Sequence, residues 1–354
     1  MSICIVDFNA GGHHLFYTSC ISDLPSITGF VGDSKHLRNF AERSKGMSIT
    51  VSDDPPKTHR LRIDMLKKHI RDHGAPSEFF LMEADQLDIP VFLRLIFGLG
   101  ASVSRVSIGG IWFRSNFMYR SSLISQAKGA CSRWLLTRWV KDTERLFFLD
   151  DLLARSIAHS VSLKPCDYWA KEPYPSEVLQ EYQGMRAVPT LLFIGAHGKR
   201  KGTAWALNAL VQHPLPFEYR IHVAGVLQDP DIEVALLRIE ALGVEVILDN
   251  RFLSESDYRS AYENADVVML PYIDFGGSSG VLMDAASYQK PVVATDYGLI
   301  GRAVCETKCG RVFTLNSVDS FIEAVSEVVA KPVDEQSFSR VQSRCSVEQF
   351  RGLF

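Results

Sequence analysis

The sequence predicts two α/β domains, each built on a doubly wound parallel sheet, and three observations support this. The chain has 354 residues, which is long for one domain but sufficient for two domains that each bury a core. Apolar runs of strand length alternate with helical stretches, as in parallel sheets with crossover helices. Each half also opens with a strand, a glycine-containing loop and the start of a helix.

Composition and charge are ordinary for a globular protein. Hydrophobic residues make up 46% and charged residues 22%, and the net charge of -3 gives no general signal for a polyanion such as nucleic acid. The seven cysteines are scattered without a C-x-x-C pair, so we expect a reducing cytoplasm and neither a disulfide framework nor a zinc site. The first residues indicate a strand rather than a signal peptide, and the apolar run 89–101 is too short to span a bilayer.

The first half begins with an apolar strand over residues 3–8, which leads into a loop with Gly11, Gly12 and His13 before a helix near His14. The loop lacks the G-x-G-x-x-G spacing, and a tight turn with surface histidines is the ordinary alternative. Further strands are expected at residues 27–31, 48–51, 79–82, 103–108, 146–149 and 158–162.

Residues that directly follow these strands are candidate site residues, because parallel sheets bind ligands at the carboxyl ends of their strands. They are Glu83, Asp85, Gly109, Gly110, Asp150 and Asp151. A helix cap or a solvated side chain explains each of them as well.

Two segments of the first half, residues 57–71 and 111–145, are basic. The second carries Trp112, Trp134 and Trp139 and is typical of an amphipathic helix that lies on an anionic membrane surface. A surface helix whose tryptophans pack inward is the alternative. Residues 162–188 are rich in proline and poor in apolar residues, which predicts the linker between the domains.

The second half is expected to contain strands at residues 190–194, 220–224, 244–248, 267–270 and 292–294. Its centre is the stretch 266–295, in which a strand ends at Pro271, a Gly/Ser loop follows, and a helix covers residues 281–288. A strand, a Gly/Ser loop and a helix N-terminus together form an anion site, since free N–H groups and the helix dipole point at one spot. A tight turn with a helix cap gives the same pattern.

This stretch resembles the donor-binding core of retaining GT-B glycosyltransferases of family 4, also called glycosyltransferase group 1. That family has a glutamate, seven residues, a second glutamate on a helix, and later G-x-P-V-V-A. Residues 291–295 (P-V-V-A-T) match the end of this pattern. Asp284 stands at the second glutamate, and Gly276 stands at the first.

The loop after strand 190–194 is similar to the family's G-R-x-x-x-x-K-G loop, whose arginine and lysine hold the donor diphosphate. Lys201 and Gly202 match, whereas Ala196 stands at the arginine position beside the basic neighbours Lys199 and Arg200. Fixed cations would stabilise the charge that develops on a leaving nucleoside diphosphate. A solvated surface loop is the ordinary explanation for such a basic run.

The resemblance implies roles for residues in both halves. The implied catalytic residues are Lys201, Asp284, His13 and Asp85. The implied donor-binding residues are Gly11, Gly12, Lys199, Arg200, Lys201, Gly202, Arg251, Phe252, Asp274, Gly277, Ser278, Ser279, Gly280, Val281 and Asp284. His13 or Asp85 would replace the histidine with which many members contact the donor sugar, Asp284 would bind the ribose, and Asp274 or the loop backbone would replace the missing first glutamate.

The resemblance also implies an architecture and a reaction. The fold would be GT-B, with an acceptor-binding Rossmann-like domain (1–185) facing a donor-binding one (186–332) across a cleft, and with residues 333–354 crossing back to the first. The reaction would transfer a sugar, with retention, from a UDP, GDP or dTDP sugar to a saccharide or lipid-linked acceptor. It would need no cofactor or metal, because cationic side chains and N–H groups hold the diphosphate. A donor phosphate oxygen would take the acceptor proton in place of a protein base. The expected setting is polysaccharide or glycolipid assembly in the cytoplasm, at the inner face of the membrane, without nucleic acid.

The departures at Gly276 and Ala196 leave two alternatives open. One is a non-catalytic GT-B scaffold or regulatory protein that binds a nucleotide, and the other is a nucleotide-sugar epimerase. A dehydrogenase is disfavoured because the first loop lacks the glycine fingerprint, although fold alone does not decide function.

Overall fold

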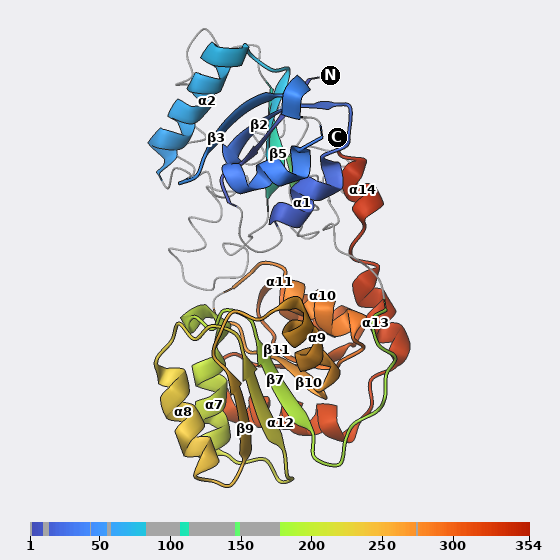
Figure 1. Ribbon diagram of the computed structural model, residues 1–354. Coiled ribbons are helices and arrows are strands. Elements are labelled where there is room, and N and C mark those ends of the chain that lie inside the picture. Colours follow the sequence, from blue (N-terminus) through green and yellow to red (C-terminus); the bar gives the residue numbers. More distant parts are fainter. Residues whose placement is uncertain are drawn as a thin grey trace, which may run out of the picture. The chain divides into compact units, whose positions relative to one another are not determined.

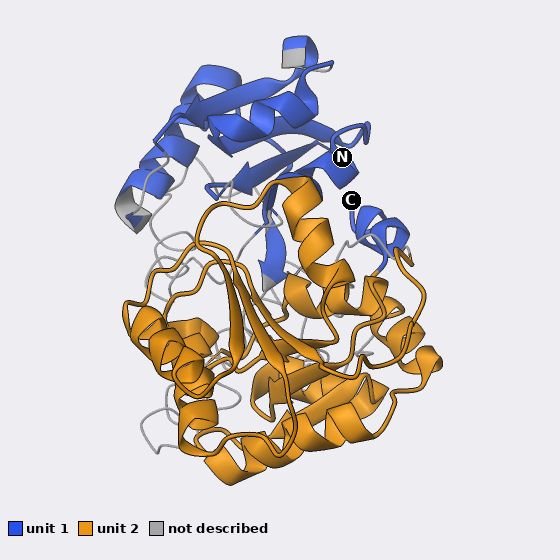
Figure 2. Ribbon diagram, turned by 60° about the horizontal axis from the view of Figure 1, so that its bottom comes forward, with its two compact units in different colours: residues 1–174, 346–354 blue, residues 175–345 orange. Residues whose placement is uncertain are grey.

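The computed structural model describes residues 2–9, 14–42, 44–54, 58–82, 107–112, 146–148, 178–273 and 275–354. The chain divides into two compact units, of which unit 1 comprises residues 1–174 and 346–354 and unit 2 comprises residues 175–345 (Figure 2). Each unit has its own six-stranded sheet. The two Rossmann-like domains predicted from the sequence are therefore confirmed as a fold class.

Unit 1 has a parallel sheet with the strand order β3-β2-β1-β4-β5-β6. Its strands are β1 (Ile3–Asp7), β2 (Ile27–Asp33), β3 (Ser48–Ser52), β4 (Glu78–Leu81), β5 (Ser107–Trp112) and β6 (Leu146–Phe148). Its described helices are α1 (His14–Ile21), the 3-10 turns η1 (Ser34–Phe40) and η2 (Ser44–Gly46), α2 (His59–His73) and α14 (Val347–Arg351). The order reverses at β1, which is the topology of a doubly wound sheet.

The C-terminal helix α14 is part of unit 1. The ring of Phe350 packs on Tyr17 of α1 with centroids 5.8 Å apart, and Phe354 meets Phe80 of β4 edge-on at 4.6 Å. Such pairs contribute beyond the area that they bury. The preceding helix α13 (Glu335–Gln342) packs instead on helices of unit 2, so the segment that returns to unit 1 begins at Ser346 rather than at residue 333.

Strand β5 differs from the sequence-based expectation. It was predicted over residues 103–108 with Gly109 and Gly110 in the loop beyond it, but both glycines lie inside the strand. They pair with Phe80 and Leu81 of β4. Glycine is typical of turns, yet here pairing with a neighbouring buried strand decides its conformation. Gly109 and Gly110 are therefore no longer candidates for a loop at the end of a strand.

Unit 2 has a parallel sheet with the order β12-β11-β10-β7-β8-β9. Its strands are β7 (Thr190–Ile194), β8 (Arg220–Ala224), β9 (Glu245–Asp249), β10 (Val267–Leu270), β11 (Val292–Thr295) and β12 (Gly310–Phe313). Its helices are η5 (Lys199–Lys201), α7 (Thr203–Gln212), α8 (Asp231–Glu240), α9 (Glu255–Glu263), α10 (Gly280–Ser287), α11 (Gly298–Thr307), α12 (Val318–Ala330) and α13.

The central strands of unit 2 are covered on both faces, which explains their continuous apolar runs. Every residue of β7 and β10 is buried, whereas the edge strand β9 is mostly exposed. Helices α7 and α8 pack together on one face, and α9 and α10 lie on the other (Figure 1). On the α7 face, Trp205 stacks on Phe313 of β12 with centroids 5.4 Å apart.

The order of unit 2 fixes where a ligand site can form. The chain leaves β7 towards β8 and β9 and then returns to the other side of β7 at β10. The helices that follow β7 and β10 therefore fall on opposite faces, which leaves a crevice at the carboxyl ends of these two strands. Among the described residues, no helix is long and apolar enough to cross a membrane.

Candidate functional site

The loops that follow β7 and β10 meet at this crevice because a glycine allows their backbones to touch. Gly202, between η5 and α7, has a φ of 68°, and a Cβ atom there would lie 1.8 Å from the carbonyl oxygen of Pro271. Close by, the N–H of Ile273 donates to the carbonyl of Arg200 at 2.9 Å. The basic loop predicted from the sequence thus lies directly against the Gly/Ser loop.

Lys201 is held at the centre of this contact. Its ammonium group donates to the carbonyl of Ile194, at the end of β7, at 3.1 Å and to the hydroxyl of Tyr272 at 2.7 Å. The same Nζ lies 4.7 Å from the centre of the Tyr272 ring, which is cation–π distance. The structure therefore places the predicted cation at the carboxyl ends of both strands that form the crevice.

Arg200 is positioned by an aromatic side chain. Its guanidinium carbon lies 4.3 Å from the centre of the Phe275 ring, and that ring stacks on Tyr272 at 5.3 Å. Lys199 and Ala196 are exposed beside it. Of the two basic neighbours of Lys201, only Arg200 has a described contact that directs it towards the Gly/Ser loop.

The N-terminus of α10 supplies hydrogen-bond donors at the same crevice. Ser279 precedes the helix without capping it through its side chain, and its hydroxyl lies 3.0 Å from the hydroxyl of Tyr272. Gly277 and Ser278 form the loop before it, and Gly280 and Val281 begin the helix. The first N–H groups of a helix lack partners within it, so this end favours an anion.

Asp284 lies one turn into α10 and contacts α9. The hydroxyl of Tyr258 donates to its carboxylate at 2.6 Å, and Tyr262 lies 3.3 Å from the same hydroxyl. Burial and the charge of Asp284 raise the pKa of Tyr258 well above its usual value, so this hydroxyl remains a donor at neutral pH. Tyr258 thereby fixes the orientation of a carboxylate that is one methylene shorter than the family's glutamate.

The loop at Gly276 lies close against the start of α11. A Cβ atom on Gly298, at the start of α11, would lie 2.7 Å from the Cα atom of Gly276 and 2.7 Å from the carbonyl oxygen of Phe275. The N–H of Leu299 also donates to the carbonyl of Gly276 at 3.3 Å. The close contact between the backbones of Gly276 and Gly298 thus holds the loop before α10 against α11.

Arg251 and Phe252 follow β9 at the same edge of the sheet, beyond β8. Arg251 donates to the Asp257 carboxylate at 2.6 Å, and Asp257 forms the capping box of α9 with Ser254. The pKa of Asp257 is lowered, mainly by its hydrogen bond from Arg251. The ring of Phe252 is 89% exposed, so it is accessible to a planar ligand.

His197 lies within the loop between β7 and η5, and its side chain is fully buried. Its Nε2 lies 3.2 Å from the carbonyl of Ala224, which can only accept, so Nε2 carries the proton and Nδ1 accepts from the Thr203 hydroxyl at 3.0 Å. Burial lowers the pKa of His197 to about 4, and the charge of Lys201 acts in the same direction. His197 is therefore neutral at physiological pH.

We expect the stability of unit 2 to fall as the pH drops from about 6.5 to about 4. Unfolded His197 binds a proton near pH 6.5 whereas folded His197 binds one near 4, so stability rises with pH across this window and acid removes on the order of 3 kcal/mol. Urea unfolding at several pH values measures it. His197→Gln should flatten the dependence, and His213→Gln, at the exposed end of α7, controls for loss of a histidine. An unchanged slope in His197→Gln contradicts the assignment.

Unit 1 contains a buried polar cluster at the end of β1 that the sequence did not predict. The carboxylate of Asp7 lies 3.0 Å from Nδ1 of His14 and 3.7 Å from Nε2 of His36. His36 also contacts the hydroxyl of Thr18 at 2.8 Å and the carbonyl of Asn9 at 3.0 Å. An aspartate at the end of a strand, followed by a histidine on the next helix, is the signal that would have found it.

Several predicted residues lie outside the described part of the chain. They are Gly11, Gly12, His13, Glu83, Asp85, Asp150, Asp151 and Asp274, and the strand expected at residues 158–162 lies there too. Most of the basic, tryptophan-bearing segment 111–145 also lies there, so its membrane role stays a prediction. Among the described residues, no cluster of histidine, cysteine, aspartate or glutamate is arranged to hold a metal ion.

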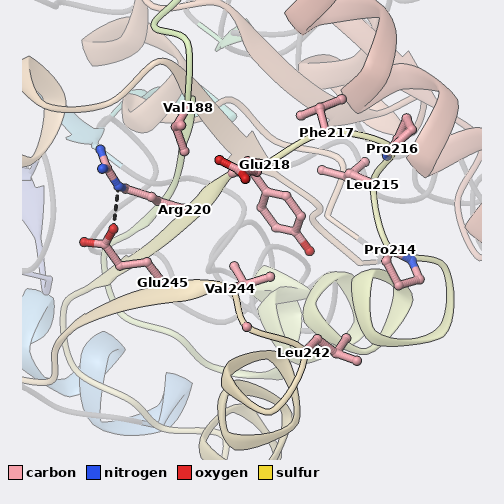
Figure 3. Close-up of a pocket in the computed structure, with 12 residues that line it drawn as sticks. Val188, Pro214, Leu215, Pro216, Phe217, Glu218, Arg220, Leu242, Val244 and Glu245 are labelled. Carbon is pink, nitrogen blue, oxygen red and sulfur yellow. Dashed lines mark hydrogen bonds and ion pairs between the residues drawn. The ribbon is translucent and has the colours of Figure 1, made fainter.

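A cavity of about 710 Å³ lies at the opposite edge of the unit 2 sheet, at the amino ends of β8 and β9. Its walls include Leu215, Phe217 and Leu242, with an ion pair of 2.6 Å between Arg220 and Glu245 at one side (Figure 3). None of the predicted site residues lines it. The predicted site residues of unit 2 lie instead at the carboxyl edge of the sheet.

The sequence lacked signals for the aromatic residues that organise this edge, namely Tyr258, Tyr272 and Phe275. The position of Tyr272, two residues beyond β10, is a weak hint for that residue. Each was missed because its partner lies far away in the chain: the Tyr272 hydroxyl contacts Lys201, 71 residues earlier, and that of Tyr258 contacts Asp284, 26 residues later.

The region that contains the basic loop and the Gly/Ser loop also matches a known protein family. Residues 188–331 match the family model described as "Glycosyl transferases group 1". No curated protein matches the sequence significantly.

Among solved structures, similar folds extend over nearly the whole chain. The apo lipopolysaccharide outer core galactosyltransferase WaaB has a TM-score of 0.65 at 14% identity, covering 99% of this chain and 97% of its own. Alr3699/HepE of Anabaena in complex with UDP has a TM-score of 0.66 at 11% identity, covering 99% and 98%. UDP-GlcNAc 2-epimerase of Neisseria meningitidis bound to UDP-GlcNAc has a TM-score of 0.60 at 12% identity, covering 99% and 98%.

Both sheets have the same doubly wound order, and in unit 2 the basic loop meets the Gly/Ser loop. At such low identity, the structural likeness shows the fold alone, and the family match covers most of the second unit. The chain has the GT-B fold, and its residues 188–331 match the model of the glycosyltransferase group 1 family.

Proposed function

We propose that this protein is a retaining glycosyltransferase that moves a sugar from a nucleoside-diphosphate sugar to an acceptor hydroxyl. One observation carries the proposal: Lys201, Arg200 and the N-terminus of α10 converge at the carboxyl ends of β7 and β10, inside the region that matches the family. Two fixed cations and the positive end of a helix favour the charge that develops on a leaving diphosphate.

The remaining donor contacts follow from the same geometry. The N–H groups at Gly280 and Val281 and the hydroxyl of Ser279 would bind phosphate oxygens, and Asp284, oriented by Tyr258, would accept from the ribose hydroxyls. Phe252 would stack on the base, with Arg251 beside it. Gly202, Gly277 and Ser278 would complete the loops around the diphosphate.

We propose that side chains, rather than a metal ion, supply the positive charge, as the family resemblance implies. A donor phosphate oxygen would take the acceptor proton on the face that the leaving group occupies, which accounts for retention. UDP is the first donor type to test, since HepE was solved with UDP. The acceptor would be a saccharide or a lipid-linked saccharide, with the enzyme at the cytoplasmic face of a membrane in polysaccharide or glycolipid assembly.

Thermal unfolding with UDP, GDP, dTDP and ADP tests the proposal. A nucleotide at about 100 times its Kd should stabilise the protein by roughly 2.7 kcal/mol, which is an easily measured shift. The sugar nucleotide of that base, incubated with candidate acceptors, should then give a glycoside whose anomeric configuration, read by NMR, is retained. An inverted product contradicts the retaining mechanism, and a folded protein that no nucleotide stabilises contradicts the donor site.

A nucleotide-sugar epimerase is the second candidate, and the structural likeness to UDP-GlcNAc 2-epimerase favours it. The two activities differ in their need for an acceptor. An epimerase converts the donor sugar when no acceptor is present, and its product remains attached to the nucleotide. Conversion of this kind supports the epimerase, whereas nucleotide binding without transfer, hydrolysis or epimerisation supports a non-catalytic scaffold.

A further inference from the structure

We propose that Tyr272 is a positioning residue, which holds Lys201 and Ser279 so that both donate to one ligand diphosphate. This role rests on the proposed function and adds a residue that neither sequence motif contains. Tyr272 lies two residues beyond β10 and contacts the basic loop that follows β7, and only 4% of its surface is exposed.

Counting donors shows how Lys201 is held. An ammonium group has three N–H donors and no acceptor, so it donates to Tyr272 and to the Ile194 carbonyl. These are its two hydrogen bonds in the described part of the chain, which leaves the third N–H for a ligand. Without the Tyr272 hydroxyl, the Lys201 ammonium group would keep only the hydrogen bond to the Ile194 carbonyl, and its flexible side chain would be less restricted.

The hydroxyl of Tyr272 also leaves Ser279 with a hydrogen-bond donor for the ligand. The oxygen of Tyr272 accepts from Lys201, so its own hydrogen can go to the Ser279 hydroxyl, 3.0 Å away. The hydroxyl hydrogen of Ser279 is then available at the N-terminus of α10, where the side chain does not cap the helix. Tyr272 and Ser279 are both buried, so solvent does not readily replace either partner.

The ring of Tyr272 acts separately from its hydroxyl. It stacks on Phe275, and the Phe275 ring lies under the guanidinium group of Arg200. Tyr272→Phe keeps this stack and its cation–π contacts while removing only the bonds to Lys201 and Ser279. The substitution therefore isolates the link between two donors that lie on opposite sides of the crevice.

Calorimetric titration with UDP and with uridine tests this role. We expect Tyr272→Phe to bind UDP about tenfold more weakly, because two donors to a charged group lose their common anchor, and to bind uridine as wild type does. Tyr219→Phe is the matched control. It removes another buried tyrosine hydroxyl from unit 2, at the opposite edge of the sheet and without a hydrogen-bond partner among the described residues.

A double-mutant cycle separates positioning from general damage. If Tyr272 acts through Lys201, Tyr272→Phe should weaken UDP binding much less in a Lys201→Ala background than in wild type. Ser279→Ala removes the other end of the link and should show the same selective loss, which keeps the test open if Tyr272→Phe folds poorly.

Two outcomes overturn the role of Tyr272 alone: wild-type UDP affinity in Tyr272→Phe, or an equal loss of UDP and uridine binding, which indicates structural damage. A wild-type protein that binds uridine but gains nothing from the diphosphate overturns the proposed donor site and this role together. The two failures are therefore distinguished by the behaviour of the wild-type protein.

Discussion

Lys201→Ala should bind UDP roughly 10- to 100-fold more weakly than wild type, because it removes a charge-assisted donor from the diphosphate. The structure gives the reason for so large an effect: the ammonium group is fixed by Ile194 and Tyr272 at the carboxyl ends of two adjacent strands. Uridine binding should be unchanged, since the base and ribose contacts lie elsewhere. Isothermal titration with both ligands measures the difference.

Lys199→Ala is the matched control for Lys201→Ala. Both residues lie in η5 and carry the same charge, but Lys199 is exposed and makes no described side-chain contact. We expect less than a threefold change in UDP affinity for Lys199→Ala. Equal losses in the two variants would indicate that only the overall charge of the loop matters, and no loss in Lys201→Ala would remove Lys201 from the donor site.

Gly202→Ala should destabilise unit 2 by about 3 kcal/mol or more. The residue adopts a left-handed conformation, which costs other residues about 1–2 kcal/mol, and the added Cβ overlaps the carbonyl oxygen of Pro271. Backbone on both sides of the contact must then move, so the loops after β7 and β10 separate. We expect weaker nucleotide binding in the protein that still folds, measured with urea unfolding and a UDP titration.

Gly243→Ala separates these two costs. Gly243 has a φ of 85°, also in the left-handed region, but a Cβ atom there meets nothing within 4 Å. It should therefore show only the conformational cost of about 1–2 kcal/mol. If the free energy of unfolding fell equally in the two variants, the overlap with the Pro271 carbonyl would not contribute to the effect of Gly202→Ala.

The strands of unit 2 illustrate what local sequence predicts well. The predicted ranges 190–194, 220–224 and 267–270 coincide with β7, β8 and β10. Central parallel strands are covered on both faces, so β7 and β10 consist almost entirely of apolar residues, and each of the three strands is followed by a glycine or proline. The basic loop and the Gly/Ser loop were recognised for a similar reason, since their residue types are contiguous in the chain.

Strand β5 and the C-terminal segment show where local sequence fails. Gly109 and Gly110 were assigned to a loop, although pairing with β4 places them in a strand. Helix α13 was assigned to the segment that crosses back, although it packs on unit 2. Glycines and short amphipathic helices fit several structures, and the choice depends on neighbours that are distant in sequence.

Local sequence patterns predicted the two doubly wound sheets, the family resemblance of the second half, and Lys201 as the cation after β7. These follow from patterns that are read within one strand, loop or helix. The contacts that hold that cation in place depend instead on tertiary packing. The hydroxyl of Tyr272, the stack of Phe275 under Arg200 and the bond from Tyr258 to Asp284 each join residues from different elements, so no periodicity or motif records them.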